Sequence, residues 1–410
     1  MKSGWQVKEL GAVCDFQRGL TYAKGDEAES SENVVLRATN INLETNQLDL
    51  SELKYINDGI VVPTNKKVRK GSLLICTASG SKSHLGKVAY IDNEYDYAFG
   101  GFMGMITVKN GLCPRYLFHL MTSPLYKDFI EGLSDGVNIN NLKFDDLRNF
   151  QVPYPPPEEQ QRIIRILDEA FEAIATAKAN AEKNLQNARA LFESHLNSVF
   201  SHLASTNESR QLGDISDLLG GFAFRSGDSV QQSSTQLVRI GNLYRNALDL
   251  GRSPVFYPDS FAFDFERYLL REGDLIMSLT GTTGKKDYGF TVKIPECSNK
   301  LLLNQRIVKF ELPSKGPVNK DYLFYYLRSK VFLDMLYATA NGTRQANLST
   351  VQMKTLRVPL CRLTEQQEIV KTLDALNEEA QTLESVYRLK LATLEEFKKT
   401  FLHQAFTGQL

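Results

Sequence analysis

Two long stretches of the chain place apolar residues alternately three and four positions apart. The first, residues 155–202, begins Pro-Pro-Pro-Glu-Glu-Gln-Gln and then contains no glycine or proline. The second begins at Thr364 with the similar sequence Thr-Glu-Gln-Gln. This spacing is typical of a helix that lies along another helix. We therefore predict two long, mutually packed helices, whose apolar faces are formed by Ile163, Leu167, Ala170, Ile174, Ala177 and Ala181 and by Ile369, Leu373, Leu376, Ala380, Leu383, Tyr387, Leu394, Phe397 and Phe401.

The rest of the chain is a tandem sequence repeat of one unit. Residues of the first copy recur 202 positions later, as Leu10-Gly11 does at Leu212-Gly213. Towards the end of each copy the offset becomes 206, as between Tyr116-Leu117-Phe118 and Tyr322-Leu323-Phe324. A net insertion of four residues in the second copy explains this change. Self-similarity of this kind predicts the order globular domain, helix, related globular domain, helix.

Each globular domain is expected to have an α+β fold. Short β-prone runs bounded by glycine, at residues 71–77 and 273–280, are typical of strands. Residues 115–121 and 321–327 are instead expected to form short helices that pack on a sheet. We place the domain boundaries at residues 1–156, 157–206, 207–362 and 363–410, with the long helices in the second and fourth segments.

The charge balance directs any anion-binding surface to the globular domains. The whole chain has 48 basic and 48 acidic residues. Residues 158–202 have five basic and seven acidic residues, and residues 364–404 have five and eight, so these stretches carry −2 and −3. The remainder therefore carries +5, so an anion-binding surface is expected on the globular domains.

Cysteine usage and hydropathy indicate a cytoplasmic protein without a membrane span. The five cysteines are scattered and form no CxxC pair, so neither a disulfide framework nor a zinc site is expected. No signal peptide and no run of about 20 apolar residues is evident.

Motifs of catalysis and metal binding are not found. Residues 80–88 resemble a phosphate-binding loop but have five residues between the glycines and end in valine. The sequence has no HExxH or GxSxG motif, and the five histidines have no ligand-like spacing. We therefore predict no catalytic residues, no metal ligands and no cofactor in this chain.

Three pairs of polar segments carry chemistry suited to DNA. Residues 79–87 and 280–286 combine glycine, hydroxyl groups and lysines, which bind phosphate oxygens. Residues 136–141 and 341–347 are rich in amides that can read base edges. A polar hairpin, a capped turn or a structural Arg–Asn pair would also explain these patterns. The predicted DNA-binding residues are Arg37, Asn40, Ser79, Lys82, Ser83, Lys87, Asn138, Asn140, Arg225, Arg239, Asn242, Thr280, Thr282, Thr283, Lys285, Lys286, Thr343, Arg344, Gln345 and Asn347.

Taken together, these features resemble the DNA specificity subunit of type I restriction-modification enzymes. The resemblance is carried by the two-copy order, by the Val-Pro…Glu-Gln-Gln segments at residues 152–161 and 358–367, and by the closing Ala-Phe-Thr-Gly-Gln-Leu of residues 405–410. It implies two target recognition domains, each reading one half of an asymmetric bipartite DNA site. It also implies that the helices form an antiparallel coiled-coil spacer, with the two domains related by an approximate twofold axis.

The resemblance further implies a division of labour among subunits. Two modification subunits would bind S-adenosylmethionine and methylate adenine, and restriction subunits would use ATP and Mg for cleavage of double-stranded DNA. The candidate partner interface comprises Glu159, Gln160, Arg162, Arg165, Glu365 and Gln366, although a solvated helix surface also explains exposed positions there. A structural coiled-coil adaptor and a stand-alone DNA-modifying enzyme are the alternative functions.

Overall fold

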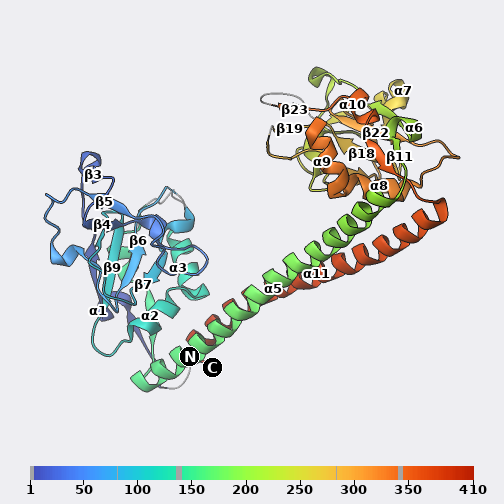
Figure 1. Ribbon diagram of the computed structural model, residues 1–410. Coiled ribbons are helices and arrows are strands. Elements are labelled where there is room, and N and C mark those ends of the chain that lie inside the picture. Colours follow the sequence, from blue (N-terminus) through green and yellow to red (C-terminus); the bar gives the residue numbers. More distant parts are fainter. Residues whose placement is uncertain (1–3, 81, 135–140, 283, 340–344) are drawn as a thin grey trace. The chain divides into compact units, whose positions relative to one another are not determined.

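The computed structural model describes residues 4–80, 82–134, 141–282, 284–339 and 345–410 (Figure 1). The chain divides into two compact units, one comprising Met1–Glu182 with Arg388–Leu410 and the other Lys183–Tyr387. Each unit contains one globular domain and a part of both long helices. None of the described helices has an apolar stretch long enough to cross a membrane.

The first globular domain contains two four-stranded sheets. One has the order β2-β9-β6-β7 and is antiparallel throughout. The other has the order β3-β5-β4-β8, in which β4 and β8 are parallel. A two-stranded ribbon of β1 and β10 closes the domain. The strands are β1 (Gln6–Glu9), β2 (Cys14–Arg18), β3 (Glu27–Ala28), β4 (Asn33–Leu36), β5 (Lys54–Ile56), β6 (Leu73–Cys76), β7 (Val88–Tyr90), β8 (Ala98–Phe99), β9 (Met103–Val108) and β10 (Gln151–Tyr154).

Strand β6 lies between two hydrophobic cores, which explains why all four of its residues are apolar. Leu73 and Ile75 belong to a core shared with the helices, whereas Leu74 and Cys76 belong to a core shared with Phe99 of the second sheet. This alternation follows from the two-residue period of a strand. The helices of this domain are α1 (Leu10–Val13), α2 (Pro114–Leu120), α3 (Pro124–Ser134) and α4 (Phe144–Arg148).

The second globular domain repeats this arrangement. Its sheets have the orders β12-β22-β18-β20 and β16-β13-β21-β17, and β13 and β21 are again parallel. The strands are β11 (Ser209–Gln211), β12 (Asp217–Gly220), β13 (Thr235–Val238), β14 (Leu243–Tyr244), β15 (Ala247–Leu248), β16 (Phe256–Tyr257), β17 (Leu269–Leu270), β18 (Leu275–Ser278), β19 (Thr280–Thr282), β20 (Thr291–Lys293), β21 (Lys300–Leu303), β22 (Ile307–Glu311), β23 (Gln345–Asn347) and β24 (Arg357–Pro359). The helices are α6 (Leu212–Ile215), α7 (Phe261–Asp264), α8 (Lys320–Arg328), α9 (Lys330–Thr339) and α10 (Thr350–Lys354).

Equivalent glycines show that the two copies share the same backbone path. A Cβ atom added to Gly19 would lie 2.0 Å from the carbonyl oxygen of Gly100. In the second domain, a Cβ atom added to Gly221 would lie 2.1 Å from the carbonyl oxygen of Asn304. Only glycine allows two backbones to approach so closely. The predicted two-copy α+β fold is confirmed.

The long helices are α5 (Pro157–Thr206) and α11 (Leu363–Thr407). In the first unit, the guanidinium group of Arg162 donates to the carbonyl oxygen of Leu410 at 2.8 Å, and Lys178 pairs with Glu395 at 2.9 Å. These contacts mean that the start of α5 lies antiparallel to the end of α11. In the second unit, the end of α5 and the start of α11 share one hydrophobic core, and Arg189 pairs with Glu384 at 2.8 Å.

Candidate nucleic-acid interface

The central glutamine of each Glu-Gln-Gln motif fastens a long helix to its own globular domain. Gln160 is 1% exposed. Its side-chain oxygen accepts from the N–H group of Cys113 at 2.8 Å, and its amide nitrogen donates to the carbonyl oxygens of Gly111 and Pro155 at 2.9 Å. Gln366 makes three equivalent bonds to its own domain, at 2.7, 3.0 and 2.9 Å. Because both amides are buried and bonded within the chain, the prediction that Gln160 and Gln366 face a partner is wrong.

The other candidate partner residues lie nearer the helix surface. Arg162 pairs with Glu159 through two bonds, at 2.7 and 2.9 Å, in addition to its bond to the C-terminal residue. Arg165 is exposed, and the carboxylate of Glu365 accepts from the N–H group of Arg362 at 3.2 Å. These side chains stay candidates for a partner interface.

Asn40 and Asn242 brace a loop inside each domain. Asn40 is 1% exposed, and its side-chain oxygen accepts from the N–H group of Arg37 at 2.9 Å. Its amide nitrogen donates to the carbonyl oxygens of Asp49 and Glu52, both at 2.8 Å. Asn242 makes the same three bonds, at 2.8, 2.8 and 3.0 Å. Since both amides are fully used inside the fold, the prediction that Asn40 and Asn242 contact DNA is wrong.

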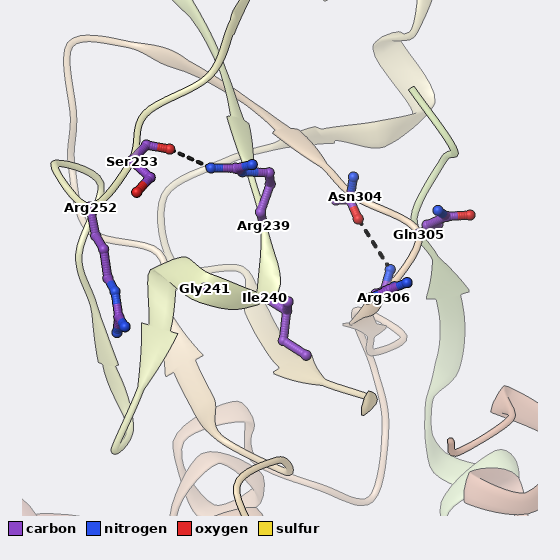
Figure 2. A pocket seen from close by; sticks show the side chains of 8 residues that line it. All are labelled: Arg239, Ile240, Gly241, Arg252, Ser253, Asn304, Gln305 and Arg306. Carbon is purple, nitrogen blue, oxygen red and sulfur yellow. Dashed lines mark hydrogen bonds between the residues drawn. The ribbon is translucent and has the colours of Figure 1, made fainter. Parts of the chain in front are cut away.

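Three arginines surround a cavity of about 400 Å³ in the second domain (Figure 2). Arg239 follows β13 and donates from its guanidinium group to the carbonyl oxygen of Ser253, while its Nε atom is buried without a hydrogen-bond partner among the described residues. Arg252 and Arg306 come from two other loops, and both are exposed. None of the three forms an ion pair with a described carboxylate. The rest of the lining is Ile240, Gly241, Ser253, Asn304 and Gln305.

The two polar segments predicted in the second domain come together as one surface. Strand β19 pairs antiparallel with β23, so that Thr282 lies opposite Gln345 and Thr280 lies opposite Asn347. The hydroxyl group of Thr280 is buried without a hydrogen-bond partner in the described part of the chain. In the first domain, a single bridge joins Ala78 to Asn141 at the corresponding place. Segments about 60 residues apart in sequence therefore form one edge in each domain.

The lysines beside this edge are accessible in the second domain. Lys285 and Lys286 are exposed, and the ammonium group of Lys286 lies 5.3 Å from the ring centre of Tyr337. The carboxylate of Asp287 accepts from the N–H group of Thr282 at 2.6 Å. Burial opposes its ionisation, but hydrogen bonding to Thr282 keeps the pKa of Asp287 below its usual value. The turn is thus held from inside while its lysines face outward.

The corresponding lysine of the first domain is less available. The ammonium group of Lys87 donates to the carbonyl oxygen of Leu43 at 2.6 Å. Partial burial, aided by the charge of Lys127, lowers the pKa of Lys87 to about 8. The hydroxyl oxygen of Ser83 lies 3.4 Å from the Nδ1 atom of His84, and Ser79 lies just after β6.

The remaining predicted residues are only partly described. Arg225 is exposed at a turn before β13, and its carbonyl oxygen accepts from the hydroxyl group of Tyr257 at 3.1 Å. Lys82 begins a short 3₁₀ helix at Lys82–His84. The predicted residues that lie outside the described part are Asn138, Asn140, Thr283, Thr343 and Arg344.

Sequence reasoning missed Arg252 and Arg306. Both lie where the two copies differ, whereas the repeat was recognised from identical residues. The sequence did contain a signal for them, because each arginine replaces a non-basic residue of the first copy. Within the described residues, no group of His, Cys, Asp and Glu is placed to hold a metal ion.

Comparison with curated proteins gives relatives of nearly the same length. The chain is 24% identical over 435 residues to the type I restriction enzyme EcoKI specificity subunit of Escherichia coli strain K12, covering 100% of this chain and 90% of the relative. It is also 24% identical over 429 residues to the type I restriction enzyme MjaVIII specificity subunit of Methanocaldococcus jannaschii, covering 99% and 93%.

Solved structures share the fold. The HsdS subunit from Thermoanaerobacter tengcongensis superimposes with a TM-score of 0.61 at 18% identity, covering 100% of this chain and 98% of the other. A chain from a structure concerned with complex assembly and conformational transition of the type I R-M system gives a TM-score of 0.76 at 18% identity, covering 100% and 99%. The family described as the type I restriction modification DNA specificity domain matches twice, over residues 2–186 and 204–390. The chain therefore belongs to the family of type I restriction modification DNA specificity domains and carries that domain twice.

Proposed function

We propose that this chain is the specificity subunit of a type I restriction-modification complex and that each globular domain reads one half of an asymmetric bipartite DNA site. The proposal rests on the observation that the two globular domains share the same backbone fold but expose different side chains. A protein that holds two related but unlike reading domains has no need of a palindromic target. The recognition domains would comprise residues 1–156 and 207–362.

DNA recognition, and not catalysis, is the role that the family assignment supports for this chain. A stand-alone modifying enzyme and a purely structural adaptor have no comparable support. The exposed Lys285 and Lys286, together with the arginine-lined pocket, provide groups that bind phosphate and base edges in the same domain.

Helices α5 and α11 would serve as a coiled-coil spacer that sets the gap between half-sites and docks two modification subunits. Supporting this, each helix belongs to both units, and the two helices are antiparallel within each unit. The buried amides of Gln160 and Gln366 fix each helix to its domain, so that domain and helix behave as one piece. The modification subunits would supply S-adenosylmethionine chemistry, and restriction subunits would use ATP and Mg. We place this assembly in the cytoplasm, in keeping with five free thiols.

The test is to purify the chain with its modification subunits and to map methylated adenines on DNA by sequencing. The expected result is methylation at one asymmetric sequence with two specified parts separated by a fixed gap. A parallel reaction without this chain should leave the DNA unmodified. Methylation that is unchanged when the chain is omitted, or that falls on an uninterrupted palindrome, would contradict the proposal.

A further inference from the structure

Arg306 and Phe102 occupy the same position in the two domains. At the end of β6, the N–H group of Thr77 donates to the carbonyl oxygen of Phe102 at 2.9 Å. After β18, the N–H group of Leu279 donates to the carbonyl oxygen of Arg306, also at 2.9 Å. The backbone frame is therefore the same, and only the side chain that it presents differs.

A second position differs in the same way. The amide nitrogen of Asn40 donates to the carbonyl oxygen of Glu52, and that of Asn242 donates to the carbonyl oxygen of Arg252. Glu52 and Arg252 are thus equivalent by their shared bonding, and both side chains are exposed. At this position the two domains carry opposite charges.

The third position is the same in both domains. Arg37 and Arg239 each precede the bracing asparagine, and each has a buried Nε atom without a hydrogen-bond partner among the described residues. In the second domain, Arg239 lines one pocket together with both variable positions, Arg252 and Arg306.

The chemistry of the variable positions differs between the domains. In the second domain, Arg252 and Arg306 line the pocket together with Arg239 (Figure 2). One guanidinium group can donate two parallel hydrogen bonds to the O6 and N7 acceptors of guanine. In the first domain, Glu52 offers an acceptor of the kind that pairs with the amino group of cytosine. Phe102, whose side chain is 73% exposed, offers an apolar surface of the kind that contacts the methyl group of thymine.

We propose that positions 52/252 and 102/306 determine the specificity of the two half-sites, with Arg306 reading a guanine for the second domain. This inference rests on the proposed function. A phosphate contact common to both domains would require positive charge in both copies, and Glu52 would repel a phosphate. The pattern of a fixed arginine with variable neighbours therefore favours base reading at the variable positions.

The experiment uses the full-length chain in complex with its modification subunits and a DNA library in which both half-sites are randomised. Arg306→Phe and Phe102→Arg are compared with the parent complex by sequencing methylated adenines. Arg306→Phe should reduce the preference for one guanine on the order of 10-fold and should change only one half-site. Phe102→Arg should change the other half-site alone. Arg267→Ala, which removes an exposed arginine outside the pocket, should leave both preferences unchanged.

Arg306→Lys separates base reading from phosphate binding. Lysine keeps the charge but not the planar pair of donors, so a guanine preference should weaken while overall DNA affinity stays near that of the parent. Equal weakening on all sequences after Arg306→Phe, with a shallower salt dependence, would assign Arg306 to a phosphate and overturn the proposal. An unchanged sequence preference would overturn it as well. If the parent complex shows no sequence-specific methylation, the proposed function itself fails, whatever the variants do.

Discussion

At the scale of single residues, Asp168 forms a charged contact between α5 and the first domain. Its carboxylate accepts from Arg115 at 2.7 and 3.0 Å and from the Nε2 atom of His119 at 2.8 Å. Burial alone would raise its pKa, but the hydrogen bonds of His119 and Arg115 lower the pKa of Asp168 to about 2. In the second domain, Asp374 accepts instead from the hydroxyl group of Tyr325 at 2.5 Å. The first domain therefore has His119 where the second has Tyr325, and burial raises the pKa of that tyrosine above its usual value.

We predict that His119 makes the first domain sensitive to mild acid. Burial lowers the pKa of His119 below its usual 6.5, although Asp168 opposes the shift, and Nδ1 is buried without a partner in the described part. Because the folded state binds the proton less readily than the unfolded state, stability is fully present above about pH 6.5 and falls as the pH decreases below it. The variant His119→Gln keeps a hydrogen-bond donor but has no group that titrates in this range. Its Tm, measured by thermal unfolding, should therefore fall less between pH 7 and pH 5 than the Tm of the parent chain. An identical decrease in the variant and the parent would contradict this.

We also predict that the two middle glutamines of the helix-opening motifs matter more than their neighbours. Gln160→Ala would leave one N–H group and two carbonyl oxygens without their partner, which costs roughly 1–3 kcal/mol of the free energy of unfolding. Gln161→Ala is the matched control, because Gln161 is exposed and lies next to Gln160. Urea unfolding of the two variants should give a clear loss for the first and little change for the second. Equal losses would show that the buried amide has no special role.

At the scale of elements, the sequence predicted local segments well and long-range partners poorly. The helices expected at residues 115–121 and 321–327 are α2 and α8, each within one residue at either end. Their periodicity and caps are local features, which the sequence shows directly. The pairing of β19 with β23 joins segments that are far apart in the chain, and nothing local in either segment specifies that partner. The burial of Asn40 and Gln160 was missed for the same reason, since spacing does not reveal what covers a side chain.

The glycines at which two backbone segments come close together give a further prediction. Gly221→Ala should destabilise the second domain, because its Cβ atom would overlap the backbone at Asn304. The expected cost is about 1–3 kcal/mol or more, as in other cases of overpacking. Gly227→Ala is the control, because a Cβ atom there would meet nothing within 4 Å. The comparison is made by thermal unfolding of both variants, and a neutral Gly221→Ala would show that the backbone relaxes at no cost.

At the scale of the whole molecule, binding to DNA must come from local charge, because the chain carries 48 basic and 48 acidic residues. Long-range attraction of a neutral protein to DNA is weak, so short-range contacts and the partner subunits have to supply affinity. We therefore predict that the isolated chain binds DNA weakly and with strong salt dependence. A filter-binding titration that found tight, salt-insensitive binding by the chain alone would contradict this.

The same reasoning predicts the effect of reversing charge beside the β19 edge. Lys285→Glu combined with Lys286→Glu should sharply reduce DNA binding by the assembled complex, since both lysines are exposed and their replacements would repel phosphate. If each lysine neutralises one phosphate, the double variant should also have a shallower dependence of log affinity on log salt, by roughly 0.9 per lost contact. Lys315→Glu with Lys320→Glu makes the same change of charge between β22 and the start of α8, and should have a smaller effect. Co-purification with the modification subunits must be unchanged in both variants. If DNA binding survives the first double substitution, this edge does not contact the phosphate backbone.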